Sequence, residues 1–141
     1  MINVDSIERG IVLDHIKAGK ALSIYRALEL DKLDCSVAVI INVKSVKMGN
    51  KDIIKINDRI DINLDVLGYL DPNITVNIIE DEHSIEKKKL HLPDRIVNVA
   101  VCKNPRCITS IEPELDHVFR LADATKGIYR CIYCDALPKR Q

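Results

Sequence analysis

The sequence predicts an α+β protein of two domains, and three observations support this prediction. Strand-like and helix-like stretches follow one another over the first 93 residues. The segment Leu90–Asp94 (LHLPD) then interrupts the pattern. Four of the five cysteines cluster after it. A C-terminal segment this short buries little apolar surface on its own, so the cysteines are expected to hold it together. We therefore predict domains at residues 1–93 and 94–141.

The first half of the N-terminal domain is expected to contain three strands and one helix. Residues 4–16 should be extended, with a break at Gly10. Residues 18–30 carry apolar side chains at helical spacing, which predicts an amphipathic helix. The β-branched run 35–45 predicts a buried strand, and 51–56 a more exposed one. A turn at Met48-Gly49-Asn50 would join these two strands into a hairpin.

The second half predicts a further helix and one strand pair. Residues 61–70 should form a short helix, with Asp61 or Asn63 as its N-cap. Asp71-Pro72-Asn73 would end it. Residues 74–80 should be a strand, and 83–87 could pair with it. The order β-α-β-β-α-β, with one extra strand, is that of a split-βαβ (ferredoxin-like) sandwich, followed by a small β-rich, zinc-ribbon-like domain.

Composition narrows the class of protein. The chain has 141 residues, of which 47% are hydrophobic and 30% are charged, and its formal net charge is zero. Nucleic-acid-binding proteins usually carry a basic excess, so this balance argues against that role. No apolar run reaches the ~20 residues that a membrane helix needs. The N-terminal residues lack a signal-peptide pattern, so a cytoplasmic location is expected.

The cysteine spacing predicts a metal site. Cys102 and Cys107 are separated by four residues, and Cys131 and Cys134 by two, with 23 residues between the pairs. Four thiolates around one ion form the closed tetrahedral shell of a structural zinc site. The alternatives are buried free thiols, a redox-active CxxC pair and an iron–sulfur centre.

Two nearby candidates are not expected to be ligands. Cys35 lies in an apolar stretch and is expected to be a core residue. His117 lies between the two cysteine pairs. Because four cysteines already fill the shell, it is expected to be a surface residue.

Polar residues of the N-terminal domain offer a weaker signal for a phosphate-bearing ligand. Lys51 and Lys55 should point to one face of their strand, since side chains alternate with a period of two. Lys87 follows the last strand. Such lysines more often serve solubility. Asp14 and His15 are adjacent and should point to opposite faces, so they do not suggest a catalytic pair, and the chain has no other enzyme signature.

Several segments together resemble one family, the regulatory chain of aspartate carbamoyltransferase. They cover essentially the whole chain and read IERGIVLDHI, MGNKDIIKI, DPNITVN, LPDRIVNVAVCKNPRC and RCIYC. The resemblance implies a noncatalytic subunit of an enzyme of pyrimidine synthesis. The N-terminal domain would bind CTP as inhibitor and ATP as activator, and would pair with a second regulatory chain. The zinc domain would contact the catalytic chain, in an assembly of two catalytic trimers and three regulatory dimers.

The resemblance also implies site residues. His15 and Lys87 would face the phosphates, Asp14 and Lys55 the ribose and base, and backbone groups near Ile7 and Ile79 the base edge. The partner interface would include Asn104, Arg106 and Asp135. The complete nucleotide set would be Val4, Asp5, Ser6, Ile7, Val12, Asp14, His15, Lys51, Lys55, Asn77, Ile79 and Lys87.

The chain departs from the family pattern at four of the positions near the nucleotide. Asp5 and Ser6 stand where the family has a glutamate and an alanine, and Glu82 and Ser84 where it usually has a tyrosine and a valine. The effector preference is therefore left open. Two other readings also stay open: a zinc-ribbon module for nucleic acid or protein, and a small enzyme using Asp14 and His15.

Overall fold

The computed structural model describes residues 7–139, and the chain divides into two compact units, Met1–Leu90 and His91–Gln141. Within residues 7–139, no helix has both the length and the apolar character needed to cross a membrane. Each unit is described by itself.

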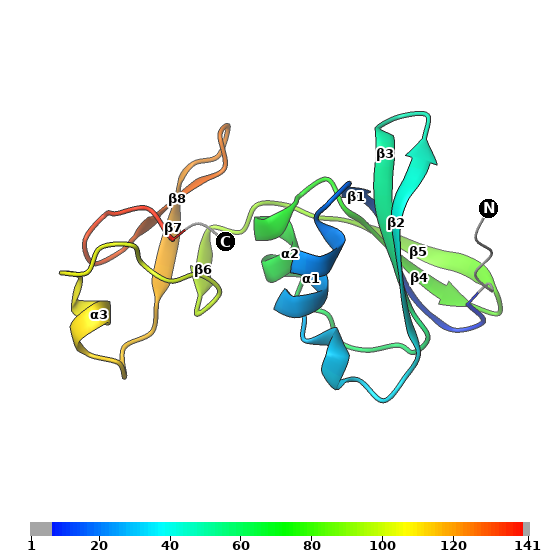
Figure 1. Cartoon of the computed structure of the whole chain (residues 1–141), viewed down its shortest axis with the longest axis horizontal. Helices are drawn as coiled ribbons and strands as arrows, with labels where there is room; N and C mark the ends of the chain where they lie inside the picture. Colours follow the sequence, from blue (N-terminus) through cyan, green and yellow to red (C-terminus); the bar gives the residue numbers. More distant parts are fainter. Residues whose placement is uncertain (1–6, 140–141) are drawn as a thin grey trace. The chain divides into compact units, whose positions relative to one another are not determined.

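The N-terminal unit is an antiparallel five-stranded sheet with its helices on one face (Figure 1). The strand order is β2-β3-β1-β4-β5. This element order confirms the predicted split-βαβ arrangement, with β5 as the extra strand. The elements are β1 (Gly10–Lys17), α1 (Ala21–Ala27), the 3-10 helix η1 (Leu30–Lys32), β2 (Val37–Ser45), β3 (Gly49–Ile56), α2 (Leu64–Leu70), β4 (Thr75–Glu80) and β5 (His83–Lys89).

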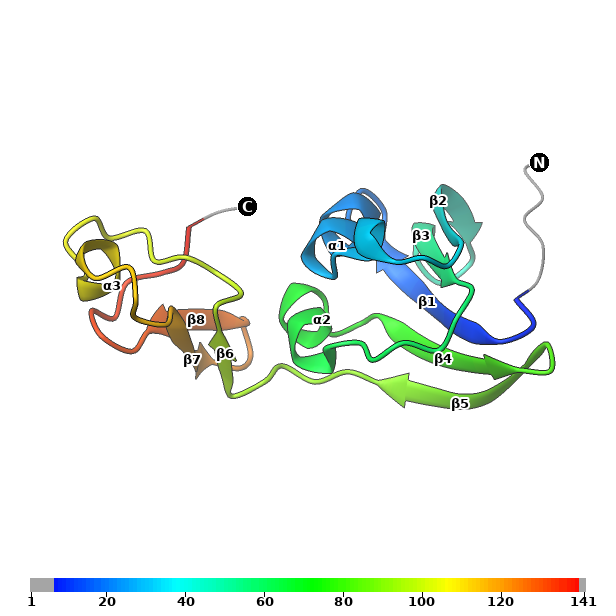
Figure 2. The ribbon, with the colours of Figure 1, turned by 90° about the horizontal axis from the view of Figure 1, so that it is seen from below.

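The core of this unit lies between the sheet and the two helices (Figure 2). Alternate residues of β3 and β4 face the helices and are almost fully buried, as the period of two requires, and in β1 a bulge between Leu13 and Ile16 lets both face the helices. They pack against Ala21 and Ile24 of α1 and Leu67 of α2. The buried sheet residues are Ile11, Leu13, Ile16, Ile54, Ile56, Val76 and Ile78.

The predicted burial of the hairpin strands was wrong. β2 was expected to be buried and β3 more exposed, but β2 is an edge strand and β3 lies between β2 and β1. Ile41 of β2 is 47% exposed, whereas Ile54 and Ile56 of β3 are fully buried. The β-branched run of β2 reflects its strand propensity, and burial depends on its place in the sheet.

The helices are shorter than predicted but begin and end for recognisable reasons. The helix expected over residues 18–30 is helical from Ala21 to Ala27, and Glu29 then adopts a left-handed φ of 54°. Leu22, one of the apolar residues at helical spacing in this segment, is 49% exposed. The side chain of Asn63 caps α2 by accepting hydrogen bonds from two backbone N–H groups, which confirms one of the two predicted caps.

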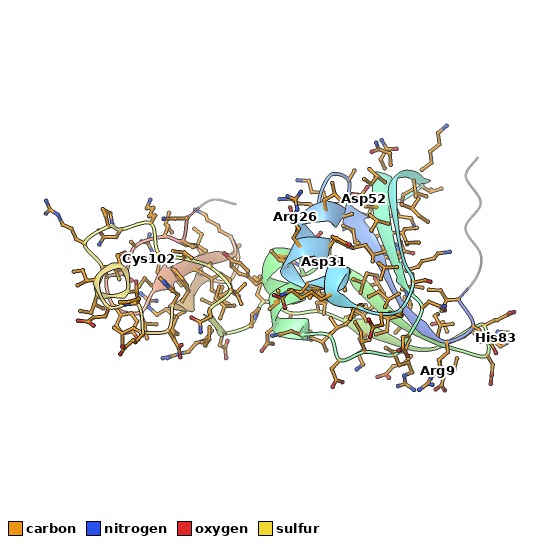
Figure 3. The ribbon with its side chains drawn as sticks, turned by 60° about the horizontal axis from the view of Figure 1, so that its bottom comes forward. Arg9, Arg26, Asp31, Asp52, His83 and Cys102 are labelled. Carbon is orange, nitrogen blue, oxygen red and sulfur yellow. The ribbon has the colours of Figure 1, made fainter. Side chains whose placement is uncertain are left out.

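Strands β1 and β2 each contain a bulge, and the bulge in β2 bonds to a buried carboxylate, Asp52 (Figure 3). His15 and Asn42 have positive φ angles of 59° and 62° at these bulges. Asp52 is fully buried, and its carboxylate accepts hydrogen bonds from the backbone N–H groups of Gly19, Ala21 and Asn42 at 2.9, 3.2 and 3.0 Å. It therefore joins the start of α1 to the edge strand β2.

The C-terminal unit has a three-stranded antiparallel sheet, β6 (Arg95–Val97), β7 (Val118–Asp123) and β8 (Ile128–Cys131), and one short helix, α3 (Ile108–Ile111). Its apolar core is small, and Ile96, Phe119 and Tyr129 supply most of its volume. A core of this size contributes little stability by itself.

Candidate metal centre and sheet-face site

The four C-terminal cysteines converge on one point. Their sulfur atoms all lie within 4.8 Å of one another. The Sγ atoms of Cys102 and Cys134 are 3.4 Å apart, and those of Cys107 and Cys131 are 3.7 Å apart. Metal–sulfur bonds of ~2.3 Å place tetrahedral sulfurs about 3.8 Å apart. The distances therefore fit a single tetrahedral ion, and they exceed the ~2.0 Å of a disulfide.

Local backbone structure positions these thiols. Cys107 is the residue before α3, and its sulfur atom accepts a hydrogen bond from the Thr109 hydroxyl at 3.1 Å. Cys131 ends β8, and the chain turns back so that its N–H donates to the carbonyl of Ala136 at 2.8 Å. Cys102 pairs with Pro138 in an isolated bridge. The two cysteine pairs are thus held by separate turns.

The thiols differ in acidity. Burial raises the pKa of Cys102 to about 12 and also raises that of Cys131. Burial also acts on Cys134, but hydrogen bonds from the Ala136 backbone and from Asn104 outweigh it and lower the pKa to about 7. Cys102 and Cys131 thus hold their protons at neutral pH until a cation displaces them. Metal binding would release protons and strengthen as the pH rises.

A row of side chains crosses the sheet face that the helices leave uncovered. Val12 lies opposite Lys55 on β3 and opposite Asn77 on β4, and Asn77 lies opposite Lys87 on β5. Residues directly opposite each other point to the same face. Four of the residues predicted to bind nucleotide therefore form one line, with a lysine at each end.

Two further polar pairs lie beside this row. The Lys51 Nζ and Asp14 Oδ1 atoms are 2.9 Å apart. The His15 Nδ1 and Thr75 Oγ1 atoms are 3.1 Å apart. Burial tends to raise the pKa of Asp14, but hydrogen bonds from Lys51 and the His15 backbone hold it below its ordinary value.

The expectation that Asp14 and His15 point to opposite faces was wrong. The bulge in β1 lies between Leu13 and Ile16, which both face the core although they are three residues apart. The two residues between them are half-buried and bond to partners on the uncovered face. The positive φ of His15 makes this possible.

Comparison with known proteins identifies the family. Residues 2–91 match the allosteric domain of the aspartate carbamoyltransferase regulatory chain, and residues 94–141 match its metal binding domain. The chain belongs to the family of aspartate carbamoyltransferase regulatory chains. It is therefore a noncatalytic chain, as the sequence predicted, and it carries a metal-binding domain.

Three relatives that carry the name of this regulatory chain cover nearly its whole length. The chain of Clostridium tetani is 54% identical over 140 residues, which are 99% of this chain and 97% of that one. The chain of Clostridium acetobutylicum is 50% identical over 139 residues, covering 99% and 95%. The chain of Bifidobacterium longum is 42% identical over 134 residues, covering 95% and 96%.

The segment before β1 lies beside the β4–β5 hairpin of this regulatory chain. Of the residues predicted to bind nucleotide, Val4, Asp5 and Ser6 lie outside the described residues, and Ile7 is buried. Glu82, in the hairpin turn, donates its backbone N–H to the carbonyl of Glu8 at 3.0 Å. Ile79 lies opposite Gly10 on one side and Ser84 on the other, and so adjoins this contact.

Gly10 is required where β1 begins. A Cβ atom at this position would collide with the carbonyl oxygen of Ile56, and it would also lie close to Ile7 and the backbone of Asp58. The break predicted at Gly10 thus corresponds to a close approach of two backbone segments.

The predicted interface residues of the regulatory chain differ in how far their side chains are already bonded within the chain. Asn104 is half-buried, and its side chain accepts the Arg106 N–H at 3.0 Å, so it shapes the cysteine loop. The Arg106 side chain is exposed. The Asp135 carboxylate forms an ion pair with the Arg120 guanidinium at 2.6 Å. The backbone carbonyl of Asp135 accepts a hydrogen bond from the Arg130 guanidinium at 2.9 Å.

Sequence reasoning missed two residues, one in each unit. His117, expected at the surface, is half-buried, and its Nδ1 atom is buried without a hydrogen-bond partner in the described part of the chain. No sequence signal marks that position. Asp52 was detectable, because the period of two places it on the same strand face as Ile54 and Ile56.

Proposed function

We propose that the N-terminal unit binds nucleotide effectors, with CTP as inhibitor and ATP as activator, on the uncovered sheet face. The supporting observation is the row Lys55, Val12, Asn77, Lys87, flanked by Asp14 and His15. Ammonium groups suit phosphates, and a carboxylate or amide suits ribose and base.

Within this site, Lys51 is the least available cation, because Asp14 already holds its ammonium group. In contrast, Lys55 and Lys87 have no ion-pair partner in the described part of the chain. In this proposal His15 and Lys87 face the phosphates, and Asp14 and Lys55 face the ribose and base. Val4, Asp5 and Ser6 would complete the site from the N-terminal segment.

Two adjacent lysines of β5 provide a test with a matched control. Lys87 lies opposite Asn77 on the uncovered face, whereas Lys88 lies opposite Val76, which faces the helices. Calorimetric titration of the full chain with CTP and with ATP should show binding about tenfold weaker for Lys87→Ala, since a charged hydrogen bond is worth about 1.5 kcal/mol or more. Lys88→Ala should leave the affinity unchanged.

Two outcomes would contradict this assignment. Equal affinity of the parent chain and Lys87→Ala would remove Lys87 from the site. No heat of binding for the parent chain at millimolar CTP or ATP would refute the nucleotide function, without bearing on assembly.

We further propose that the metal is one structural zinc per chain and that it forms the surface that contacts the catalytic chain. Four cysteine ligands leave no open coordination position, which is typical of structural zinc. The exposed Arg106 and the neighbouring Asn104 lie on the loop between the first two ligands, and Asp135 directly follows the last. Folding of these loops would depend on the ion.

At the level of the assembly, we propose that regulatory chains pair as dimers that bridge two catalytic trimers in pyrimidine synthesis. The nucleotides would act by binding the low- and high-activity states with different affinities, because an effector with equal affinity for both states shifts nothing. The effect would have to reach the catalytic chain through the C-terminal unit.

A further inference from the structure

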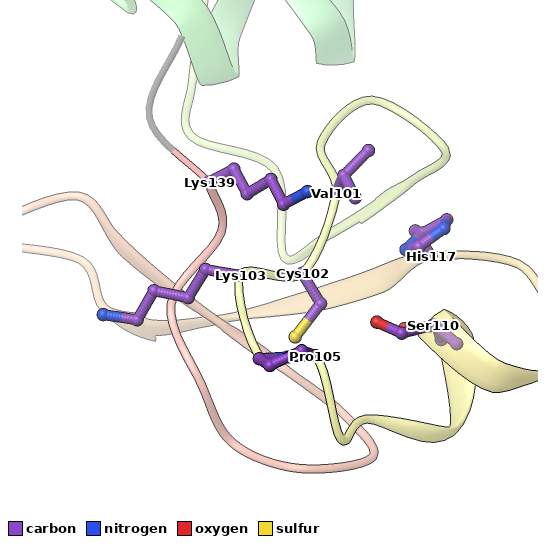
Figure 4. A pocket seen from close by; sticks show the side chains of 8 residues that line it. Val101, Cys102, Lys103, Pro105, Ser110, His117 and Lys139 are labelled. Atoms are coloured by element: carbon purple, nitrogen blue, oxygen red, sulfur yellow. The ribbon is translucent and has the colours of Figure 1, made fainter.

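A pocket lies beside the metal centre within the C-terminal unit (Figure 4). Its volume is about 310 Å³. Residues on its wall come from the first cysteine loop, α3, the residue before β7 and the C-terminal segment. Its lining residues include Val101, Lys103, Ser110, His117 and Lys139.

His117 lines this pocket, and one of its ring nitrogens is unused by the described residues. Its Nδ1 atom is buried and has no hydrogen-bond partner among residues 7–139. A buried polar atom without a hydrogen bond raises the free energy of the folded chain. A binding partner that forms this hydrogen bond therefore stabilises the complex. The backbone of His117 is also held in place, because Asn98 bonds to both of its backbone groups, at 2.9 and 2.8 Å.

The nearest acidic neighbour of His117 in the sequence does not fill this role. Asp116 accepts a hydrogen bond from the side-chain amide of Asn98 at 2.9 Å. Its carboxylate therefore already serves the turn that positions His117.

Lys139 adds a positive charge at the same pocket. Its backbone N–H donates to the carbonyl of Val101 at 2.7 Å, which fixes the start of the side chain. Figure 4 shows its ammonium group reaching toward Val101, whereas that of Lys103 points away from the pocket. Within the described residues, no acceptor lies within hydrogen-bonding distance of the Lys139 ammonium group.

Exposed aliphatic side chains adjoin this polar pocket. Val101 is on its wall, and Ile108 and Ile111 flank the two α3 residues that line it. Their exposed fractions are 46%, 42% and 64%. A free inorganic anion would leave these side chains in water, whereas a protein surface would cover them. Apolar contacts around a charged anchor are typical of protein interfaces.

We propose that this pocket receives an acidic side chain of the catalytic chain, which accepts hydrogen bonds from Lys139 and His117 while the aliphatic side chains bury against the surrounding surface. The inference rests on the proposed function, in which the C-terminal unit contacts that chain.

The test compares the affinities of full-length variants for the catalytic trimer by calorimetry. Lys139→Met removes the charge and keeps the aliphatic stem, and His117→Phe keeps a ring and removes the nitrogens. Each should weaken binding about tenfold, as expected for one charge-assisted hydrogen bond. The double variant should bind more tightly than the product of the two single effects predicts, since both groups bond to one carboxylate. Lys126→Met, in the turn between β7 and β8, is the control and should bind normally.

The outcomes separate this inference from the proposed function. Zinc content and melting temperature equal to those of the parent chain would show that the variants fold. Normal binding by folded Lys139→Met and His117→Phe would overturn the anchor while leaving docking intact, and strictly multiplicative effects would overturn the shared carboxylate. If His117→Phe does not fold, the affinity of Lys139→Met for the trimer still tests the anchor, because Lys139 is exposed. A parent chain that does not bind the trimer would refute the proposed docking itself.

Discussion

Asp52 shows how a single residue can organise several segments of this fold. Its carboxylate is fully buried and bonds to backbone N–H groups at the start of α1 and at the bulge of β2. These N–H groups would otherwise lack partners next to the core, and buried polar groups need hydrogen bonds. The residue therefore determines where α1 begins and how the edge strand bends.

Asp52→Asn is expected to destabilise the chain. One carboxylate oxygen would become an NH₂ group, which cannot accept a hydrogen bond and would face a backbone N–H. The loss of a buried, charged hydrogen bond should lower the free energy of unfolding by about 1.5–3 kcal/mol. Urea denaturation measures this, with the exposed Asp31→Asn as the control, for which a change within about 0.5 kcal/mol is expected. Equal stability of the two variants would mean that the bonds of Asp52 contribute little.

The sequence is a good guide to those residues whose role depends on local spacing. The four cysteines could be predicted because two short turns bring each pair together, and the observed sulfur distances agree with that prediction. In contrast, the sequence could not predict that Asp14 and His15 both lie on the uncovered face of the sheet. A left-handed φ at His15 changes the alternation of side chains along β1. The backbone position of His117 depends on a hydrogen bond to Asn98, 19 residues away along the chain.

At the scale of elements, the two edges of the five-stranded sheet differ in chemistry. β5 carries three consecutive lysines, Lys87–Lys89, and charged edges resist pairing with another chain. β2 is largely aliphatic, and its Ile41 is 47% exposed. An exposed aliphatic edge is suited to pairing with a second copy, so we assign the proposed dimer contact to β2.

Ile41→Asp is expected to weaken the regulatory dimer. A carboxylate at this edge would have to be desolvated on pairing, without a partner, and this is unfavourable. Sedimentation velocity over a concentration series should show a dimer dissociation constant raised about tenfold or more, for a cost of at least 1.4 kcal/mol. Ile85→Asp, on the opposite edge strand and similarly exposed at 54%, should leave the dimer intact. Dissociation by Ile85→Asp alone would instead place the contact on β5.

Element types and their order could be read from the sequence, whereas which strands lie inside the sheet could not. Periodicity within a segment distinguishes a helix from a strand, and the β-α-β-β-α-β order specified the topology. Whether a strand lies at the edge depends on which strands flank it. β3 lies between β2 and β1, so the segment 51–56 is the more buried one and the segment 35–45 the more exposed one, the reverse of the prediction.

At the scale of the whole molecule, the two units depend on different sources of stability. The N-terminal unit has an apolar core built from both helices and the sheet. The C-terminal unit has few buried apolar side chains, and its four cysteines converge on one point. A tetrahedral metal site can contribute on the order of 10–16 kcal/mol to folding, so the ion rather than the core is expected to hold this unit together.

Removal of the metal should therefore separate the two functions proposed for this regulatory chain. Chelation is expected to unfold residues 91–141 and abolish co-purification with the catalytic trimer, whereas residues 1–90 keep their fold and their affinity for CTP. The readouts are co-purification and CTP calorimetry on the same chelated sample, and added zinc should restore docking. Acid should act in the same direction as the chelator, because protons compete for the thiolates and the buried Cys102 and Cys131 have raised pKa values. Docking that survives complete removal of zinc would contradict the structural role of the ion, and loss of CTP binding along with docking would show that the N-terminal unit depends on the metal as well.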